Sequence, residues 1–140
     1  MKKLDNFTKC LNKLKTADFT KDDEFYKAGV ITHFTLTFEL AWKALQATLR
    51  FHGVVEAETG SPREILKLGY KFGYIDNDDV WLTMLRKRNA MSHIYDEDES
   101  DETLSLIHDR FIAAFAELER ALREKLSNIE AASPDELADY

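Results

Sequence analysis

Apolar side chains recur at steps of three and four residues through most of this chain, and this spacing predicts helices. Such steps place the apolar residues on one face of a helix, which can then pack against a core. The first stripe falls within residues 3–17 and consists of Leu4, Phe7, Leu11 and Leu14. No segment of useful length alternates apolar and polar residues as a half-buried strand does, so we predict no sheet.

The second predicted helix is the longest and covers about thirty residues, from the acidic cluster at Asp22 to Gly53. Acidic residues suit the partial positive charge of a helix N-terminus, and a glycine allows the left-handed conformation that often ends a helix. At 1.5 Å per residue, this rod is about 45 Å long and needs several neighbours to cover it. Its apolar face consists of Ile31, Phe34, Phe38, Ala41, Trp42, Leu45 and Leu49.

Capping residues mark two shorter helices after a predicted loop over residues 54–60. Ser61 can cap the free amides of a helix, Pro62 fits its first position, and Glu64 can complete the capping box. A further helix is expected to begin near Asn77. It carries, on adjacent turns, Trp81, Met84, Leu85 and Arg88.

The last third of the chain reads as an acidic connector over residues 96–102 and one long, regular helix after it. We expect the connector to be solvated and to cap that helix, with docking of a basic partner surface as the alternative. The stripe of that helix consists of Leu104, Ile107, Phe111, Phe115, Leu118, Leu122 and Leu126. The fold class expected is therefore all-α, an antiparallel four- to five-helix up-and-down bundle over residues 1–130. Residues 131–140 form a short tail, in which Ser133 to Glu136 could start another helical turn.

Charge and cysteine content narrow the functional classes. The formal net charge is −7, which argues against a broad basic surface for coating nucleic acid but leaves room for a small site that contacts one or two phosphates. The single cysteine, Cys10, excludes an intrachain disulfide and reads as a small buried thiol. The N-terminus has no apolar run typical of a signal peptide, and no apolar stretch reaches the roughly 20 residues that cross a bilayer, so we expect a cytoplasmic protein with no membrane partner.

Residues 86–95 are the most unusual stretch, because three cations, a histidine and a phenol gather there in an otherwise acidic chain. One interpretation is structural: cations stabilise a helix C-terminus and can pair with the acidic residues 96–99. The other interpretation is phosphate chemistry by Arg88 and His93. On a straight helix these two side chains point about 140° apart. They converge only if the helix ends or distorts near Ser92, or if a second chain completes the site.

Other candidate residues have ordinary explanations. Glu39 and Lys43 lie one helical turn apart and are expected to form a surface pair, with a role in lining a cleft as the alternative. Trp42 and Trp81 are expected in the core or in a dimer contact rather than as platforms for base stacking. The remaining histidines have no ligand-like spacing, so we predict no metal site.

The octapeptide Arg88-Asn89-Ala90-Met91-Ser92-His93-Ile94-Tyr95 resembles the Arg-x4-His-x-Tyr signature of the HEPN superfamily. Three further blocks, at residues 38–43, 60–64 and 93–97, are similar to the branch called nucleotidyltransferase substrate-binding proteins. The resemblance extends over about residues 4–126. One such motif alone arises by chance, but several blocks in the same order make the similarity specific.

This resemblance implies a helical homodimer in which two copies of the motif face one cleft. It also implies a partner, a minimal nucleotidyltransferase antitoxin that needs ATP and Mg, whereas no cofactor is expected in this chain. In related pairs the HEPN protein is a metal-independent endoribonuclease toxin acting on RNA, and the partner silences it by transferring AMP to the motif tyrosine. That residue corresponds here to Tyr95.

Two functions remain open alongside a plain helical scaffold. In a ribonuclease, His93 would act as base or acid, Arg88 would hold phosphate oxygens, and Asn89 would orient the phosphate or the histidine. The alternative is a non-catalytic subunit that binds a nucleotide or other substrate for a two-component nucleotidyltransferase.

Overall fold

The computed structural model describes residues 2–90 and 96–127, and every regular element in these two ranges is helical. The all-α prediction is therefore confirmed for the described residues. The elements are α1 (Lys2–Lys15), α2 (Glu24–Phe51), the 3₁₀ helix η1 (Val55–Glu58), α3 (Pro62–Lys71), α4 (Asp78–Asn89), α5 (Glu97–Leu106), the π-helical η3 (Ile107–Phe111) and α6 (Ile112–Ser127).

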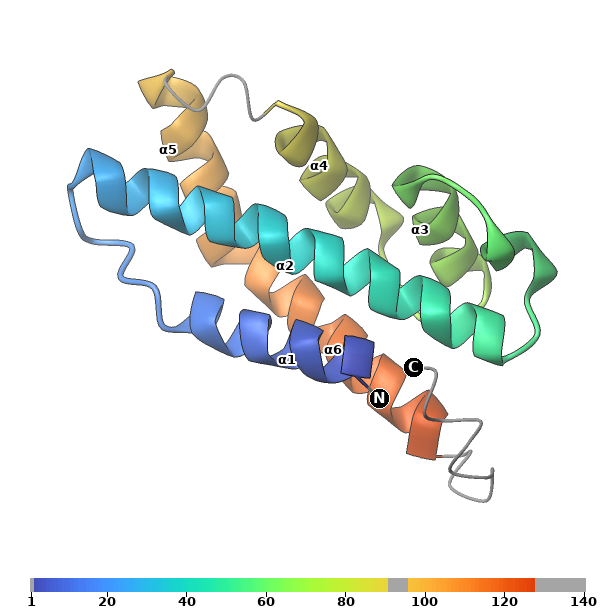
Figure 1. The fold of residues 1–140 in the computed structure, drawn as a ribbon. Coiled ribbons are helices and arrows are strands. Elements are labelled where there is room, and N and C mark those ends of the chain that lie inside the picture. Colours follow the sequence, from blue (N-terminus) through green and yellow to red (C-terminus); the bar gives the residue numbers. More distant parts are fainter. Residues whose placement is uncertain (1, 91–95, 128–140) are drawn as a thin grey trace.

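The long helix α2 runs through the middle of the bundle and contacts α1, α3, α4, α5 and α6. Figure 1 shows α1 and α4 running against the direction of α2, while α5 and α6 run along it as one nearly continuous rod. A helix of 28 residues thus obtains the several neighbours that its length requires. No helix in the described ranges is both long enough and apolar enough to span a bilayer.

Aromatic rings fill the centre of the bundle. Phe34 of α2 stacks on Phe111 with ring centroids 5.2 Å apart, and the Trp81 ring of α4 meets Phe115 of α6 edge-on at 5.5 Å. Phe38 of α2 also packs against Trp81, with ring centroids 6.3 Å apart. These rings join α2, α4 and α6 into one core and fix the first turn of α4 relative to α2.

Caps position the helix ends as the sequence predicted. Ser61 accepts a hydrogen bond from the Glu64 amide at the start of α3, and Asn77 accepts one from the Asp79 amide at the start of α4. After α2, Gly53 adopts a φ of 82°, which is the left-handed conformation that a glycine tolerates. The predicted ends of these elements differ from the observed ones by a few residues at most.

Three local predictions were wrong or incomplete. Residues 54–60 are not all loop, because residues 55–58 form η1. The acidic run 96–102 caps the helix that follows, as predicted, through Asp96, but it is not a connector, because it supplies the first turns of α5, where carboxylates lie at the positive end of the helix. The last helix is interrupted by the π-helical turn η3, where the Ile112 amide donates to the Ile107 carbonyl. The steps of four residues between buried Ile107, Phe111 and Phe115 do not reveal such an insertion.

Candidate active site at the end of α4

Arg88 lies in the last turn of α4, next to the point where the helix stops. The helix ends at Asn89, and the Ala90 amide closes it by donating to the Arg86 carbonyl at 3.1 Å. The helix thus ends before Ser92, the position at which the sequence suggested an end or a distortion. The relative placement of Arg88 and His93 lies outside the described residues.

The Arg88 guanidinium is held by two side chains. Its Nη2 forms an ion pair with Glu39 Oε1 in the middle of α2, and its Nη1 donates to Asn89 Oδ1 at 3.1 Å. The Arg88 side chain is 31% exposed and the Glu39 side chain 24%, so the pair is only partly open to solvent. Glu39 Oε1 is itself buried, and no described residue donates a hydrogen bond to it, so the ion pair with Arg88 is its polar contact. The guanidinium is therefore fixed at two of its three nitrogens.

Glu39 does not form the surface pair with Lys43 that its spacing suggested. An exposed Glu–Lys pair one turn apart contributes only about 0.3–0.5 kcal/mol, so a guanidinium on a neighbouring helix competes easily for the carboxylate. The second oxygen, Glu39 Oε2, accepts a hydrogen bond of 3.0 Å from Trp42 Nε1. Lys43 instead places its ammonium 5.9 Å from the centre of the Trp42 ring. The sequence suggested a role in lining a cleft only as the alternative to that pair, and it did not identify Arg88 as the partner of Glu39.

Lys87, the residue before Arg88, connects α4 to α5. Its ammonium lies 3.0 Å from Glu99 and 3.2 Å from Glu102, and its side chain is only 8% exposed. The prediction that a cation of this segment pairs with residues 96–99 is thereby confirmed for Lys87. Adjacent residues at the end of α4 thus attach it to two different helices, α2 through Arg88 and α5 through Lys87.

The remaining motif residues divide into two groups. Asn89 is exposed and contacts Arg88, as described above. His93 and Tyr95 lie in residues 91–95, outside the described residues, so their proposed roles stay predictions. The described part supplies one oriented cation, Arg88, at a helix end. In the sequence, a histidine and a tyrosine follow it within seven residues. Such a cation can bind a phosphate or a carboxylate.

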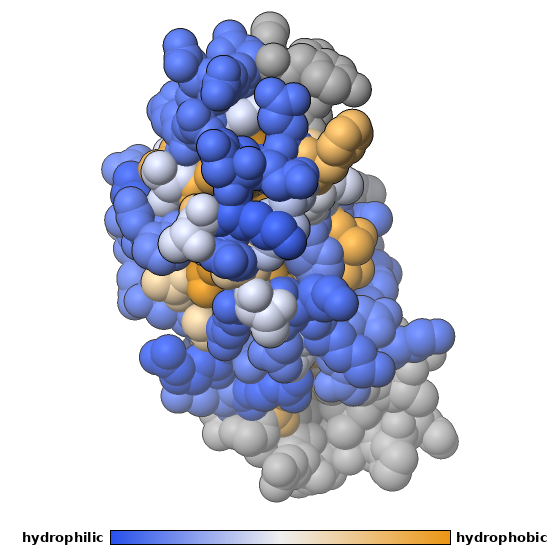
Figure 2. Space-filling model, turned by 90° about the vertical axis from the view of Figure 1, so that its left-hand side faces the viewer, coloured by the Kyte–Doolittle hydropathy of each residue, from blue (hydrophilic) through white to orange (hydrophobic). Residues whose placement is uncertain are grey.

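The surface at this end of the bundle is mainly hydrophilic. Figure 2, which views the left-hand side of Figure 1, shows mostly hydrophilic residues with small separate hydrophobic patches. Lys27 near the start of α2 pairs with Asp22 at 2.9 Å and with Asp101 of α5 at 3.5 Å. Together with the Lys87 contacts, these pairs attach both α2 and α4 to α5.

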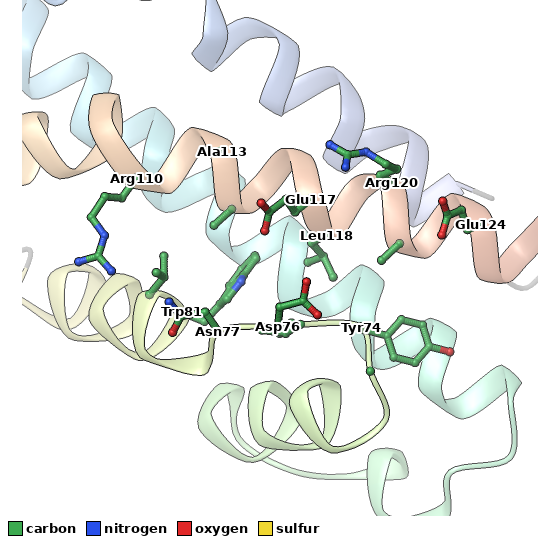
Figure 3. Close-up of a pocket in the computed structure, with 15 residues that line it drawn as sticks. Tyr74, Asp76, Asn77, Trp81, Arg110, Ala113, Glu117, Leu118, Arg120 and Glu124 are labelled. Carbon is green, nitrogen blue, oxygen red and sulfur yellow. The ribbon is translucent and has the colours of Figure 1, made fainter.

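A second hollow lies at the other end of α4. It has a volume of about 630 Å³ and is bounded by the connection from α3 to α4 on one side and by α6 on the other. Figure 3 shows Trp81 at its base and charged side chains of both signs around it, among them Arg110, Asp76 and Glu117. None of these three residues belongs to the motif. The hollow is therefore separate from the candidate site.

A cysteine–histidine contact lies between α1 and α2. Cys10 Sγ is 3.1 Å from Thr37 Oγ1 and 3.4 Å from His33 Nε2. Burial raises the pKa of the Cys10 thiol, and its hydrogen bond with Thr37 opposes that rise only in part. A raised pKa means a protonated, unreactive thiol at neutral pH, so the pair is a packing contact and not a nucleophile with its base. In the described ranges, no three His, Cys, Asp or Glu side chains converge as metal ligands would.

Comparisons with known proteins agree with this arrangement of helices. The family model described as "Nucleotidyltransferase substrate binding protein like" matches residues 2–124. A Haemophilus influenzae protein named "Probable ribonuclease HepT" is 28% identical over 100 residues, which cover 70% of this chain and 68% of that protein.

Two solved structures share the fold. One, also from Haemophilus influenzae, is described as revealing the fold of a substrate binding domain of a nucleotidyltransferase. It is 23% identical, with a TM-score of 0.76, and the match covers 86% of this chain and 98% of that one. The other, from Thermus thermophilus, is 24% identical, with a TM-score of 0.63 and coverage of 89% and 98%. At these identities the likeness concerns the fold.

Proposed function

This chain belongs to the nucleotidyltransferase substrate binding protein-like family, and from that premise we propose that it is a metal-independent endoribonuclease, the toxin of a cytoplasmic toxin–antitoxin pair. The single observation that carries the proposal is the orientation of Arg88 at the end of α4, five residues before His93. The relative named as a probable ribonuclease supports the same activity.

The proposed reaction is an internal attack within the RNA. The 2′-oxygen forms a bond to phosphorus while the bond from phosphorus to the 5′-oxygen breaks, which leaves a 2′,3′-cyclic phosphate and a free 5′-hydroxyl. One His93 imidazole accepts the proton of the 2′-hydroxyl, and a protonated imidazole gives a proton to the departing 5′-oxygen. Arg88 binds the non-bridging oxygens, on which negative charge increases as the bond to phosphorus forms.

A homodimer would supply the second imidazole. Each chain contains one histidine in the motif, and the reaction needs a base and an acid at the same time. A twofold axis beside the end of α4 would bring two copies of Arg88 and His93 to one cleft. The protein at working concentration is therefore expected to be a dimer, and sedimentation or light scattering would measure this.

The proposed partner is a minimal nucleotidyltransferase that holds ATP and Mg. The Tyr95 hydroxyl oxygen would attack the α-phosphorus of ATP and release pyrophosphate, and the partner would take up the phenolic proton. A phenol with a pKa of about 10 is a poor nucleophile by itself, so this step needs the partner enzyme. The adenylate then places a phosphate anion two residues from His93, where it competes with RNA phosphate for Arg88.

The test of ribonuclease activity uses purified protein and a labelled RNA in the presence of EDTA. We expect cleavage with cyclic phosphate ends, and a loss of at least about a hundredfold for His93→Ala and for Arg88→Lys, which keeps the charge but removes the planar donor group. Arg86→Ala is the matched control, because Arg86 is an exposed cation two residues before Arg88. If His93→Ala and Arg88→Lys cleave RNA as the unmodified protein does, the proposal is wrong.

The toxin and modification steps need a separate experiment with the partner. Expression of the chain alone should arrest growth, and co-expression of the nucleotidyltransferase should restore it. Mass spectrometry should then find one added AMP on the unmodified chain and none on Tyr95→Phe. Restored growth with the Tyr95→Phe variant would show that the partner neutralises the chain without adenylylating Tyr95.

A second candidate function is a non-catalytic subunit that presents a nucleotide or another substrate to the nucleotidyltransferase. The family description and the Haemophilus influenzae fold described as a substrate binding domain favour it. Calorimetry with ATP, with other nucleotides and with the partner distinguishes the two. Tight nucleotide binding by a chain that does not cleave RNA would favour this candidate. If the chain binds neither a nucleotide nor the partner, this candidate is excluded.

A further inference from the structure

The block Phe38 to Lys43 on α2 is one of the segments by which the sequence resembles its family, and the proposed chemistry does not use it. Phe38 is fully buried and fixes this part of α2 in the aromatic core. From that anchor the next residue, Glu39, reaches α4, and Trp42 lies one turn further along α2. The block therefore connects the core directly with the Arg88 guanidinium.

Both carboxylate oxygens of Glu39 are occupied. Oε1 pairs with Arg88 Nη2, and Oε2 accepts the indole N–H of Trp42 at 3.0 Å. Trp42 is partly buried and belongs to the same helix as Glu39. Its hydrogen bond therefore fixes the plane of the Glu39 carboxylate through a contact within α2 alone. The orientation of the Arg88 guanidinium is thus set from α2.

A carboxylate beside a phosphate-binding cation has an electrostatic cost. It lowers the local positive charge and so weakens the attraction for RNA. Its benefit is geometric, because a guanidinium held in one plane presents its remaining donors in a defined direction. An arginine has five N–H donors. Among the described residues, Nη1 donates to Asn89 and Nη2 pairs with Glu39, and we expect other donors of the group to reach phosphate oxygens.

We propose that Glu39, held by the Trp42 indole, is a positioning residue that fixes the plane of the Arg88 guanidinium at the cost of weaker RNA binding. The orientation itself stands on the contacts above, whereas its effect on cleavage rests on the proposed ribonuclease function. Two variants separate charge from orientation. Glu39→Gln removes the negative charge and weakens the hold on Arg88, and Trp42→Phe removes only the indole N–H while keeping an aromatic ring.

The kinetic test measures kcat and KM for a defined RNA at low salt. For Glu39→Gln we expect kcat to fall by about tenfold, because orientation is lost, and KM to fall by about threefold, because a negative charge is removed. For Trp42→Phe we expect a smaller fall in kcat with KM unchanged. The matched control is Glu119→Gln on α6, which removes a carboxylate that also pairs with an arginine, Arg123, at 3.0 Å. If Glu39 contributed only its charge and did not orient Arg88, Glu39→Gln would lower KM and leave kcat unchanged.

A second readout does not depend on activity. In ¹⁵N spectra of the folded protein, the Arg88 guanidinium should give resolved, slowly exchanging Nη signals, assigned by their absence from Arg88→Lys. These signals should broaden or collapse in Glu39→Gln and weaken in Trp42→Phe, with no change in Glu119→Gln. Circular dichroism establishes that each variant is folded, and Trp42→Phe carries the test if Glu39→Gln is not.

The outcomes distinguish this inference from the proposed function. Unchanged Arg88 signals and unchanged kcat in Glu39→Gln would overturn the inference and leave the ribonuclease proposal standing. If the unmodified protein cleaves no RNA, the ribonuclease proposal fails, and the Arg88 signals alone decide whether Glu39 orients the guanidinium.

Discussion

Lys87 of α4 and Glu99 of α5 form an ion pair of 3.0 Å that joins the two helices on either side of residues 91–95. The pair holds the last turn of α4 next to the first turn of α5. The Lys87 side chain is 8% exposed and that of Glu99 31%, so water weakens this pair less than it weakens a fully exposed one. The two helices that flank residues 91–95 are therefore attached to each other by charge.

Replacement of Lys87 by methionine tests this connection. Lys87→Met keeps the length of the side chain but removes its charge, and we expect a loss of about 1 kcal/mol in the free energy of unfolding. RNA cleavage should fall as well, because the motif segment is less well held. Urea denaturation and the cleavage assay measure the two effects. Arg86→Ala should change neither, and equal effects in both variants would argue against a specific role for Lys87.

Replacement of Gly69 in α3 by alanine should create a steric clash in the core. A Cβ atom there would lie 2.7 Å from Leu45 Cδ2 and 3.1 Å from Ile75 Cδ1, both in the core. Alanine favours a helix by about 1 kcal/mol over glycine, but overpacking a core costs about 1–3 kcal/mol, so Gly69→Ala should destabilise the fold on balance. Thermal or urea denaturation measures this loss.

Gly29 provides the matched control for Gly69. It also lies inside a helix, but a Cβ atom there meets no atom within 4 Å. Gly29→Ala should therefore stabilise the protein by about 0.5–1 kcal/mol through helix propensity alone. Opposite signs for the two variants would confirm that packing decides the effect at Gly69. The same sign for both would contradict the close packing of α3 on α2.

His52, at the end of α2, predicts a dependence of stability on pH. Desolvation lowers the pKa of His52 in the folded protein, and the nearby Lys125 ammonium lowers it further. The unfolded chain, with a pKa of about 6.5, therefore binds a proton more readily than the folded chain does. Stability should be greatest above about pH 6.5 and should decrease as the pH falls from there toward the lowered pKa of the folded state.

The measurement compares the urea midpoint at several pH values between about 5 and 8 for the unmodified protein and for His52→Gln. The difference in midpoint between the two proteins should be constant above about pH 7 and should shift in favour of the variant at lower pH. A difference that does not change with pH would exclude a contribution from His52. Other histidines and carboxylates affect both proteins equally, so they cancel in this comparison.

We expect the Cys10 thiol of the folded protein to react slowly with alkylating agents. Its raised pKa and its burial, with 7% of its surface exposed, keep the thiol protonated and hard to reach. Alkylation by iodoacetamide at pH 8 should therefore be more than about tenfold slower in the folded protein than in urea. Mass spectrometry follows the labelling. Rapid labelling of the folded protein would show that the contact between α1 and α2 opens readily.

Particular elements show how far the sequence leads toward the fold. The stripe in α1, the long stripe in α2 and the caps at Ser61 and Asn77 depend on spacing and on neighbours within one turn, and the structure confirms each of them. The acidic run at residues 96–102 was predicted correctly as a helix cap but wrongly as a connector, because carboxylates are equally compatible with a solvated connector and with the first turns of a helix. The cap formed by Asp96 decides between the two.

The candidate site shows a similar division. Arg88, Asn89, His93 and Tyr95 could be selected from the sequence because they form one short motif in an acidic chain. Glu39 was also noticed, but as a partner of Lys43, since neighbours about one turn away are all that a helix by itself provides. Its actual partner, Arg88, lies 49 positions further along the chain.

By itself, the sequence determined that the chain forms helices, where most of them begin, and which short segment carries the candidate chemistry. These properties follow from backbone hydrogen bonds and side chains within a few residues of one another. Only the tertiary structure decided which cation meets which carboxylate, and where the last helix takes its π-helical turn. Those outcomes depend on how α2, α4, α5 and α6 pack around a common aromatic core, which no local pattern of residues encodes.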